Sequence, residues 1–348
     1  MGIETLVENS VAITQFFQDT FPNLLVLMRG INVVSEPEVC FLLFIGIYWG
    51  INREKGSRYI YLLGLVLVIF SIVQHALQVP APFWFDKTLM KAESGSFAAP
   101  NLNIAIAILM ALPFRRFIRT DLVLPTFLAA GILVGLSQVY LGIAGMFDLF
   151  LGFILAIFIV LIWRRWNRRF GKSFAQRILG QRFWIAIFFT ACLGLIYYVL
   201  INWVQGNGFT GVFDNQIDQN LHSRAWQTGF INTIQALAIL GGAGVGISIE
   251  SARIKFRPIK NPGSTAISWI IGFLLLGGIL YLTSVISTTS AYFQTGEPLS
   301  IIVLALKSIL VTVFCAYIIP WLLTIVGTAT SEVASVPTIS LKNYSVER

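Results

Sequence analysis

The stretch FDLFLGFILAIFIVLIWRRWNRR, residues 147–169, decides the class of this protein. Its first part, 147–163, is apolar except for Asp148 and is long enough to cross a bilayer as a helix. Four arginines follow this run directly, within residues 164–169. An apolar run with basic residues at its end is typical of a membrane-spanning helix that stops at a cytoplasmic interface.

The rest of the chain repeats this pattern. The composition is 56% hydrophobic and only 11% charged, with a mean hydropathy of +0.79. A soluble domain carries more charge, and a β-barrel has alternating rather than continuous apolar runs, so both classes are excluded. We expect an all-α polytopic membrane helical bundle with about nine transmembrane helices. The expected spans are 37–52, 58–79, 101–114, 121–142, 147–163, 183–203, 229–249, 265–287 and 301–327.

The basic residues predict the topology. With nine spans, 19 of the 24 Lys and Arg residues fall on one side of the membrane. The positive-inside rule places that side in the cytoplasm, so the N-terminus lies outside and the C-terminus inside. We therefore expect a multi-pass protein of the plasma (inner) membrane whose basic loops meet anionic lipid. This distribution argues against nucleic acid as a partner, although the net charge is +8.

The segments between the spans suggest five parts. Residues 1–36 carry apolar residues at helical spacing and predict an amphipathic, interfacial segment, and no cleaved signal peptide is expected. Two long polar stretches, 78–101 and 205–229, are expected as outer loops. The predicted parts are 1–36, a five-helix membrane core at 37–163, a basic cytoplasmic linker at 164–182, a four-helix membrane region at 183–327, and a cytoplasmic tail at 328–348.

Few residues are suited to metal binding or redox chemistry. Three cysteines are scattered through apolar segments and are expected to behave as small buried side chains: Cys40, Cys192 and Cys315. The chain has only two histidines, so we expect no metal site and no cofactor. Lys307 lies well inside a predicted span, where a cation is either functional or reaches to the interface with its long side chain.

The stretch GLSQVYLGIAGMFDLFLG, residues 135–152, resembles the third motif of the type 2 phosphatidic acid phosphatase superfamily, Ser-Arg-x5-His-x3-Asp. These are integral-membrane lipid phosphatases in which the motif's His attacks phosphorus and its Asp orients that His. Ser137 and Asp148 stand at the Ser and Asp positions. Gln138 stands where the family has Arg, and Ala144 stands where it has the nucleophilic His.

Two further stretches resemble the other family motifs. QHALQVPAPFW aligns with Lys-x6-Arg-Pro, with Gln74 at the Lys, Ala81 at the Arg and Pro82 at the Pro. GSFAAPNLNIA aligns with Pro-Ser-Gly-His, the motif whose His protonates the leaving oxygen. Ala98, Ala99, Pro100 and Asn101 stand at those positions. The resemblance covers roughly residues 25–163 and implies a phosphatase-like core followed by a C-terminal helical half.

The chemistry at these positions does not match that of the family. Phosphoryl transfer needs cations or oriented N–H donors to meet the charge on phosphate oxygens. The aligned residues offer amides, alanines and prolines, and Pro100 has no N–H to donate. Asp148 and Asn101 are better suited to capping the helices that they begin.

The prediction is a non-catalytic pseudophosphatase, a structural or lipid-binding subunit of a membrane complex. Its partners would be other membrane proteins and a membrane lipid or isoprenoid. The alternative is a phosphatase for membrane lipid phosphates or isoprenoid diphosphates with an unusual active site. Its nucleophile would then be a residue outside the motifs; nearby candidates for new roles are His75, Lys87, Lys91, His222 and Arg224. A third hypothesis, a transporter or channel, is disfavoured because ionisable residues within the spans are scarce.

Overall fold

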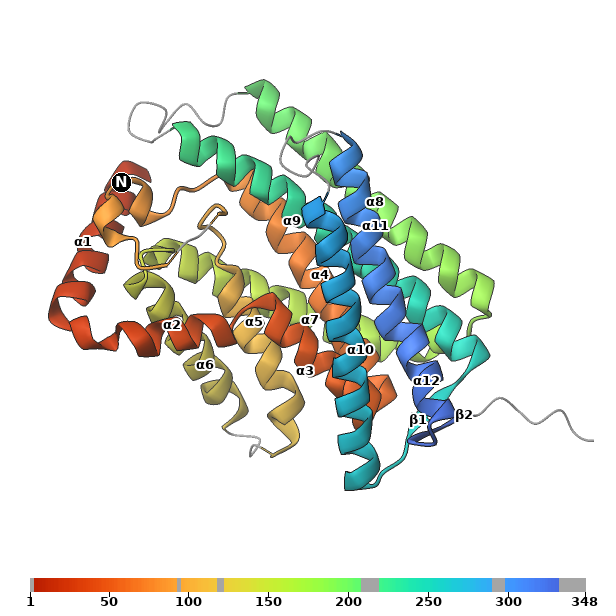
Figure 1. The fold of residues 1–348 in the computed structure, drawn as a ribbon. Helices are drawn as coiled ribbons and strands as arrows, with labels where there is room; N and C mark the ends of the chain where they lie inside the picture. The colour runs from red at the N-terminus through yellow and green to blue at the C-terminus, as the bar shows by residue number, and fades with distance from the viewer. Residues whose placement is uncertain (1–2, 93–94, 118–121, 208–218, 290–297, 332–348) are drawn as a thin grey trace, which may run out of the picture.

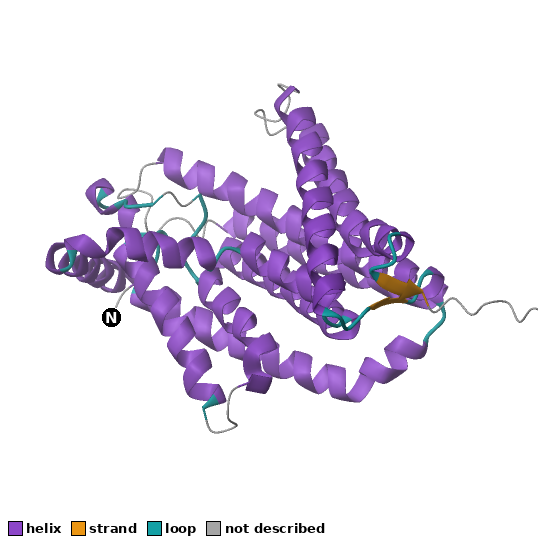
Figure 2. Ribbon diagram, turned by 60° about the horizontal axis from the view of Figure 1, so that its bottom comes forward, coloured by secondary structure: helices purple, strands orange, loops and turns teal. Residues whose placement is uncertain are grey.

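The computed structural model describes residues 3–92, 95–117, 122–207, 219–289 and 298–331. Almost all of this part of the chain is helical (Figures 1 and 2), which confirms the all-α class. Six helices are long and apolar enough to cross a membrane, at Arg53–Trp84, Met146–Gly171, Leu179–Val204, Asn220–Arg253, Pro262–Thr283 and Ile301–Ile325. They support a membrane-spanning protein.

The nine apolar runs all form helices, but they differ in length. The run at 37–52 is α3, which meets the span criterion only together with the helix before it, across a bend of 50°. The runs at 101–114 and 121–142 form shorter apolar helices, Leu102–Arg115 and Pro125–Tyr140. Six or seven spans therefore follow from length and composition in the described residues, and the number nine stays a prediction.

The N-terminal half contains α1 (Ile3–Thr20), η1 (Pro22–Leu24), α2 (Leu25–Val34), α3 (Pro37–Gly50), α4 (Arg53–Leu77), η2 (Pro82–Trp84), η3 (Lys87–Leu89), α5 (Leu102–Ala111), η4 (Leu112–Phe117), α6 (Val123–Tyr140) and α7 (Met146–Gln176). The C-terminal half contains α8 (Leu179–Asn207), α9 (Gln219–Arg253), β1 (Phe256–Pro258), α10 (Pro262–Thr289), α11 (Pro298–Val313), a π-helical turn η7 (Phe314–Ile318), α12 (Ile319–Ile325) and β2 (Ala329–Ser331).

Two details of the predicted segments were wrong. The basic stretch 164–182 is no loop: α7 runs through it to Gln176 and α8 begins at Leu179, because Arg, Lys and Gln are good helix formers. Residues 219–229 of the second long polar stretch are the first turns of α9, while 208–218 lie outside the described residues. The tail begins with β2, which pairs antiparallel with β1 in the ribbon seen in Figure 2; residues 332–348 lie outside the described part.

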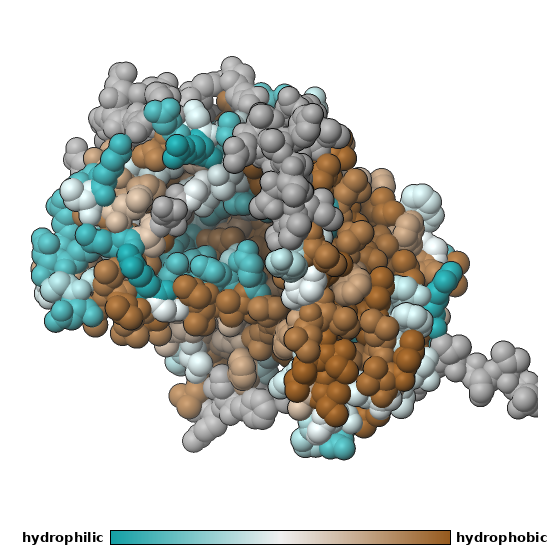
Figure 3. Space-filling view, viewed as in Figure 1, coloured by the Kyte–Doolittle hydropathy of each residue, from teal (hydrophilic) through white to brown (hydrophobic). Residues whose placement is uncertain are grey.

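Helices α4 and α9 form the centre of the bundle. About half of each span is buried (56%), against 11% for α8 and 17% for α10. Small residues on α9 permit this close packing: a Cβ on Gly244 would lie 2.5 Å from the Cβ of Ala186 on α8, and one on Gly246 would lie 2.7 Å from that of Ala316 in η7. The apolar surface over α10, α11 and α12 is the broad hydrophobic region of Figure 3.

One buried ion pair joins the two halves of the chain. Arg53, at the start of α4, donates to the carboxylate of Glu250 near the end of α9 at 2.8 Å. The other carboxylate oxygen accepts the backbone N–H of Phe256 at 2.6 Å, and the Glu250 side chain is fully buried. Arg182 of α8 reaches the same end of α9, where its guanidinium donates to the hydroxyl of Ser251 at 2.7 Å. Three of the basic segments therefore meet at one end of the bundle.

Candidate functional site

The first two motif segments are tied together by hydrogen bonds. The side-chain amide of Gln74, near the end of α4, donates to the carbonyl of Pro100 at 2.9 Å. The backbone N–H of Ala98 donates to the carbonyl of Val79 at 2.9 Å. Gln74 occupies the position at which the resembled family has a lysine. In this chain its polar group is used to hold a neighbouring loop.

The third segment joins the other two. The backbone N–H of Asn101 donates to the carbonyl of Asp148 at 3.0 Å, and that of Phe83 donates to the carbonyl of Gly142 at 3.3 Å. A Cβ on Gly152 would lie 2.6 Å from the carbonyl oxygen of Asn101, so the start of α5 and the first turns of α7 approach as closely as a bare backbone allows. The three stretches singled out from the sequence therefore converge in space.

The two polar residues expected to cap helices do so. Asn101 precedes α5, and its side-chain oxygen accepts the N–H of Ile104 at 3.2 Å. Asp148 lies in the first turn of α7 and reaches back to accept the N–H of Gly145 at 2.7 Å. Both arrangements satisfy amide groups that a helix leaves unpaired at its start. The Asp148 carboxylate thus has a structural partner, and Ala144, at the position where the family has a histidine, gives it no imidazole to orient.

The remaining polar motif residues also bond to the protein itself. Gln138 donates its amide to the side-chain oxygen of Asn32 at 2.6 Å, and Asn103 donates to the same oxygen at 3.1 Å. The hydroxyl of Ser137 donates to the carbonyl of Val134 at 2.7 Å. Asn32 belongs to α2, outside all three motif segments, and its role was missed because nothing local in the sequence pairs it with Gln138.

The apolar motif positions are closed. Ala81, Ala99 and Ala144 have no exposed surface, and Ala98, Pro82 and Pro100 are buried as well. Asp148 is the only ionisable residue among the eleven aligned positions. A phosphate group would therefore meet no cation and one carboxylate here, an arrangement that disfavours anion binding.

Helix α1 covers the loops that carry the first motif. Gln18 donates its amide to the carbonyls of Leu89, at 2.9 Å, and Tyr140, at 2.8 Å. Gln15 donates to the carboxylate of Asp86 at 3.1 Å. Hydrogen bonds from Thr88 to that carboxylate hold the pKa of Asp86 below its usual value. The amphipathic N-terminal segment thus packs on the protein along part of its length.

His75 follows Gln74 on α4, about 100° further around the helix, and its ring contacts residues of the C-terminal half. Its Nδ1 hydrogen-bonds the hydroxyl of Tyr197 on α8 at 2.8 Å, and its ring packs edge-on against Trp226 at 4.1 Å. The sequence alone named no partner for this imidazole. The actual partner comes from the C-terminal half, a pairing that no sequence spacing reveals.

The remaining candidate side chains, His222, Lys91 and Lys307, lie in different parts of the fold. His222 lies on the first turns of α9, with its ring 5.8 Å from that of Phe97, so the C-terminal half does reach over the first and second motifs. Lys91 donates to the carbonyl of Thr88 at 3.1 Å, beside its own loop. Lys307 is partly buried on α11. No cluster of His, Cys, Asp or Glu suited to a metal ion occurs within the described residues.

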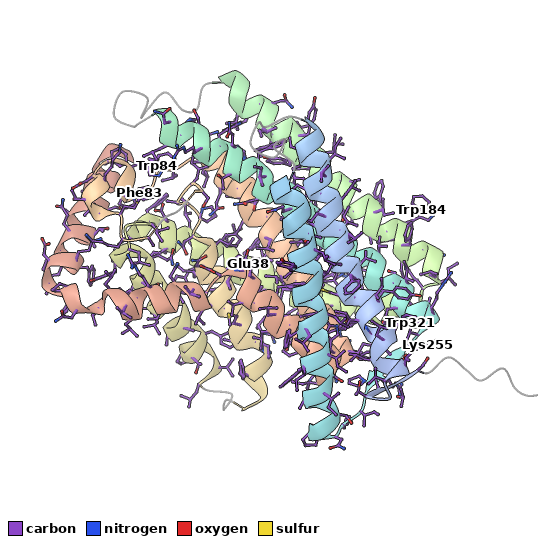
Figure 4. All side chains as sticks on the ribbon, viewed as in Figure 1. Glu38, Phe83, Trp84, Trp184, Lys255 and Trp321 are labelled. Atoms are coloured by element: carbon purple, nitrogen blue, oxygen red, sulfur yellow. The ribbon has the colours of Figure 1, made fainter. Side chains whose placement is uncertain are left out.

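Several buried polar atoms close to the motif segments have no hydrogen-bond partner within the described residues, two of them on rings beside Phe97. His75 and Trp84 have their rings 6.0 and 5.9 Å from it. Their Nε2 and Nε1 atoms, and both amide atoms of Gln78, are buried without a hydrogen-bond partner in the described part of the chain. Figure 3 shows a hollow above α2 and α3, and Figure 4 places Trp84 and Phe83 at its upper left and Glu38 at its lower edge.

Comparison with known proteins adds no family assignment. No protein-family model matches the chain, no curated protein matches it, and no solved structure matches it. The function must therefore be argued from the residues and their geometry.

Proposed function

We propose that this chain is a non-catalytic membrane protein, a pseudophosphatase with a fold like that of type 2 phosphatidic acid phosphatases, which serves as a structural or lipid-binding subunit of a membrane complex. One observation carries the proposal. The three motif segments converge, yet every polar motif side chain bonds to the protein and the alanine positions are closed. The meeting of the three segments is compatible with the backbone arrangement of a phosphatase site. The side chains at the aligned positions are not compatible with the chemistry of such a site.

The hollow beside the motifs suggests the class of ligand. Close to the motifs, the indole N–H of Trp84 and the amide of Gln78 are buried without a hydrogen-bond partner in the described part of the chain, and unsatisfied buried groups of this kind cost about 1–3 kcal/mol each. An uncharged polar head that entered this region would supply the missing hydrogen bonds. Apolar and aromatic side chains, including Ala81, Phe83 and Trp84, pack around Phe97, so these polar groups lie in apolar surroundings. A neutral amphiphile, such as a lipid or isoprenoid with a hydroxyl or amide head, fits this environment better than a lipid phosphate.

The proposal includes a topology: plasma membrane, N-terminus outside and C-terminus in the cytoplasm. Contacts between the basic segments support it. Arg53 and Arg182 both reach the end of α9, and Arg115 of η4 interacts electrostatically with Arg164 of α7. Basic segments that a nine-span topology assigns to the cytoplasmic side therefore lie near one another in pairs. Labelling of a cysteine introduced at residue 173 from outside intact cells would refute this orientation.

The central test is a phosphate-release assay on the full-length protein purified in mild detergent, with lipid phosphates and isoprenoid diphosphates as substrates. We expect no release above a blank membrane preparation. The Ala144→His variant should stay inactive as well, because the groups that would hold phosphate are also absent. Phosphate release that persists through repurification of a single chain would refute the pseudophosphatase assignment.

The same preparation tests ligand binding. Mass spectrometry of co-eluting lipids and proteins should find a neutral amphiphile or a stoichiometric protein partner. Trp84→Phe removes the buried indole N–H together with part of the ring, so retention of a bound lipid should fall. Trp184→Phe makes the same change on an exposed tryptophan of α8 and should leave retention unchanged. Equal retention in both variants would exclude the hollow as the binding site.

A further inference from the structure

An arginine-lined cavity lies at the end of α7, far along the chain from the motif residues on that helix. It has a volume of about 460 Å³ and is lined by Leu161, Arg164, Arg165, Arg168 and Arg169. With about 100° between successive helical residues, the four arginines cover an arc of about 140° on one face of the helix, and Leu161 points into the middle of that arc. The cavity is therefore an open, cationic face of α7 with the exposed Leu161 at its apolar end.

The positive charge of this face is not neutralised by the protein. Within the described ranges, no acidic side chain lies within ion-pair distance of the four guanidinium groups. Arg115 of η4 adds a fifth positive charge that repels Arg164. Guanidinium groups bind phosphate with strong, often bidentate hydrogen bonds, so an anion with phosphate oxygens is the complementary ligand.

The surface next to the cavity identifies the source of that phosphate. Along α7 an apolar stripe leads to the arginine face at helical spacing. Its members are all exposed, with Phe150 at 62% and Leu161 at 56%: Phe147, Phe150, Ile154, Phe158 and Leu161. A free phosphate would use only the arginines. A phospholipid would place its head among the arginines and its chains along the stripe, which covers both surfaces at once.

We infer that this face of α7 is a binding site for an anionic phospholipid, with the arginines on its phosphate and the apolar stripe on its acyl chains. The site is separate from the motif region and does not depend on the proposed function. It would fix the depth and rotation of α7 in the membrane, since the head group and the chains constrain the helix at two levels. The arginine face distinguishes this site from ordinary lipid contact because it selects for charge.

The test compares two variants with the same change in charge. The full-length protein is reconstituted in bilayers of phosphatidylcholine with increasing phosphatidylglycerol, and retained lipids are counted by native mass spectrometry after extraction. Replacing Arg164, Arg165, Arg168 and Arg169 by Gln should weaken phosphatidylglycerol retention by about tenfold or more, since each cation near a lipid surface contributes about 1 kcal/mol. The matched control replaces Arg253, Lys255, Arg257 and Lys260 by Gln. These residues do not line the arginine cavity, so the control should lose much less phosphatidylglycerol retention than the first variant.

Two outcomes would overturn the inference. Equal losses in the two quadruple variants would mean that general basicity, rather than the cavity, attracts the lipid. If millimolar inorganic phosphate displaces the lipid while Phe158→Ser with Leu161→Ser has no effect, the site binds a soluble anion. Should the first quadruple variant fail to fold, R165Q/R168Q against R257Q/K260Q gives the same comparison on exposed or partly exposed residues. None of these readouts uses phosphate release, so they fail or succeed independently of the pseudophosphatase assignment.

Discussion

The buried pair of Arg53 and Glu250 gives the sharpest prediction about stability. Each oxygen of the Glu250 carboxylate has its own donor: the guanidinium of Arg53 at 2.8 Å and the N–H of Phe256 at 2.6 Å. Glu250→Gln keeps the shape but turns one oxygen into an NH2 group. That NH2 group must then face one of the two donors, the guanidinium of Arg53 or the N–H of Phe256. In addition, the charge of Arg53, whose side chain is only 25% exposed, loses its counter-charge.

The expected loss follows from this burial. Removing one member of a buried ion pair costs about 3–5 kcal/mol, because the remaining charge is left without compensation. The adjacent pair of Glu54 and Arg58 is the matched control, with a distance of 3.6 Å and a Glu54 side chain that is 77% exposed. Glu54→Gln should cost less than about 1 kcal/mol, because solvent already screens that pair.

The free energy of unfolding of each variant is measured in detergent, with increasing denaturant and circular dichroism as the signal. A double variant, Arg53→Met with Glu250→Leu, replaces the pair by apolar side chains and should recover much of the stability lost in Glu250→Gln. The coupling energy from the full cycle should then be at least about 2 kcal/mol. Additive effects of Arg53→Met and Glu250→Leu on the free energy of unfolding would refute the reasoning. Equal losses of stability in Glu250→Gln and Glu54→Gln would refute it as well.

Three further predictions concern the motif region and its surroundings. Gly152→Ala should destabilise the protein by about 1–3 kcal/mol in the same unfolding assay, because the new methyl group meets the carbonyl of Asn101 at 2.6 Å. Gly277→Ala is the control: a Cβ there has no atom within 4 Å, so the change should be neutral or stabilising. A larger loss of stability in Gly277→Ala than in Gly152→Ala would contradict the packing. Asn101→Ala removes the cap of α5 and should cost about 1 kcal/mol, measured as a shift of the unfolding midpoint. Tyr197→Phe deletes one hydrogen bond to His75 and should also cost about 1 kcal/mol; no change would indicate that the hydroxyl is not a partner of the imidazole.

The local features of this fold were readable from the sequence. Long apolar runs must form helices in a membrane, because only intrachain hydrogen bonds satisfy the backbone there. The caps at Asn101 and Asp148 follow from side chains that precede or begin apolar runs. The spacing of the three motifs also led to segments that meet in the structure. Each of these conclusions depends on a backbone requirement or on residues close in the chain.

The choice of which apolar faces pack and which remain exposed could not be read in this way. The stripe on α7 and the buried face of α4 are equally hydrophobic as sequences, because a lipid chain and a leucine side chain offer the same apolar environment. The pairing of His75 with Tyr197 and of Arg53 with Glu250 joins residues 122 and 197 positions apart. The sequence by itself determined the helices and the residue types at the aligned positions. The tertiary structure alone decided that the polar motif side chains bond inward and that the α7 arginines have no ion-pair partner among the described acidic residues, since both depend on distant segments meeting in space.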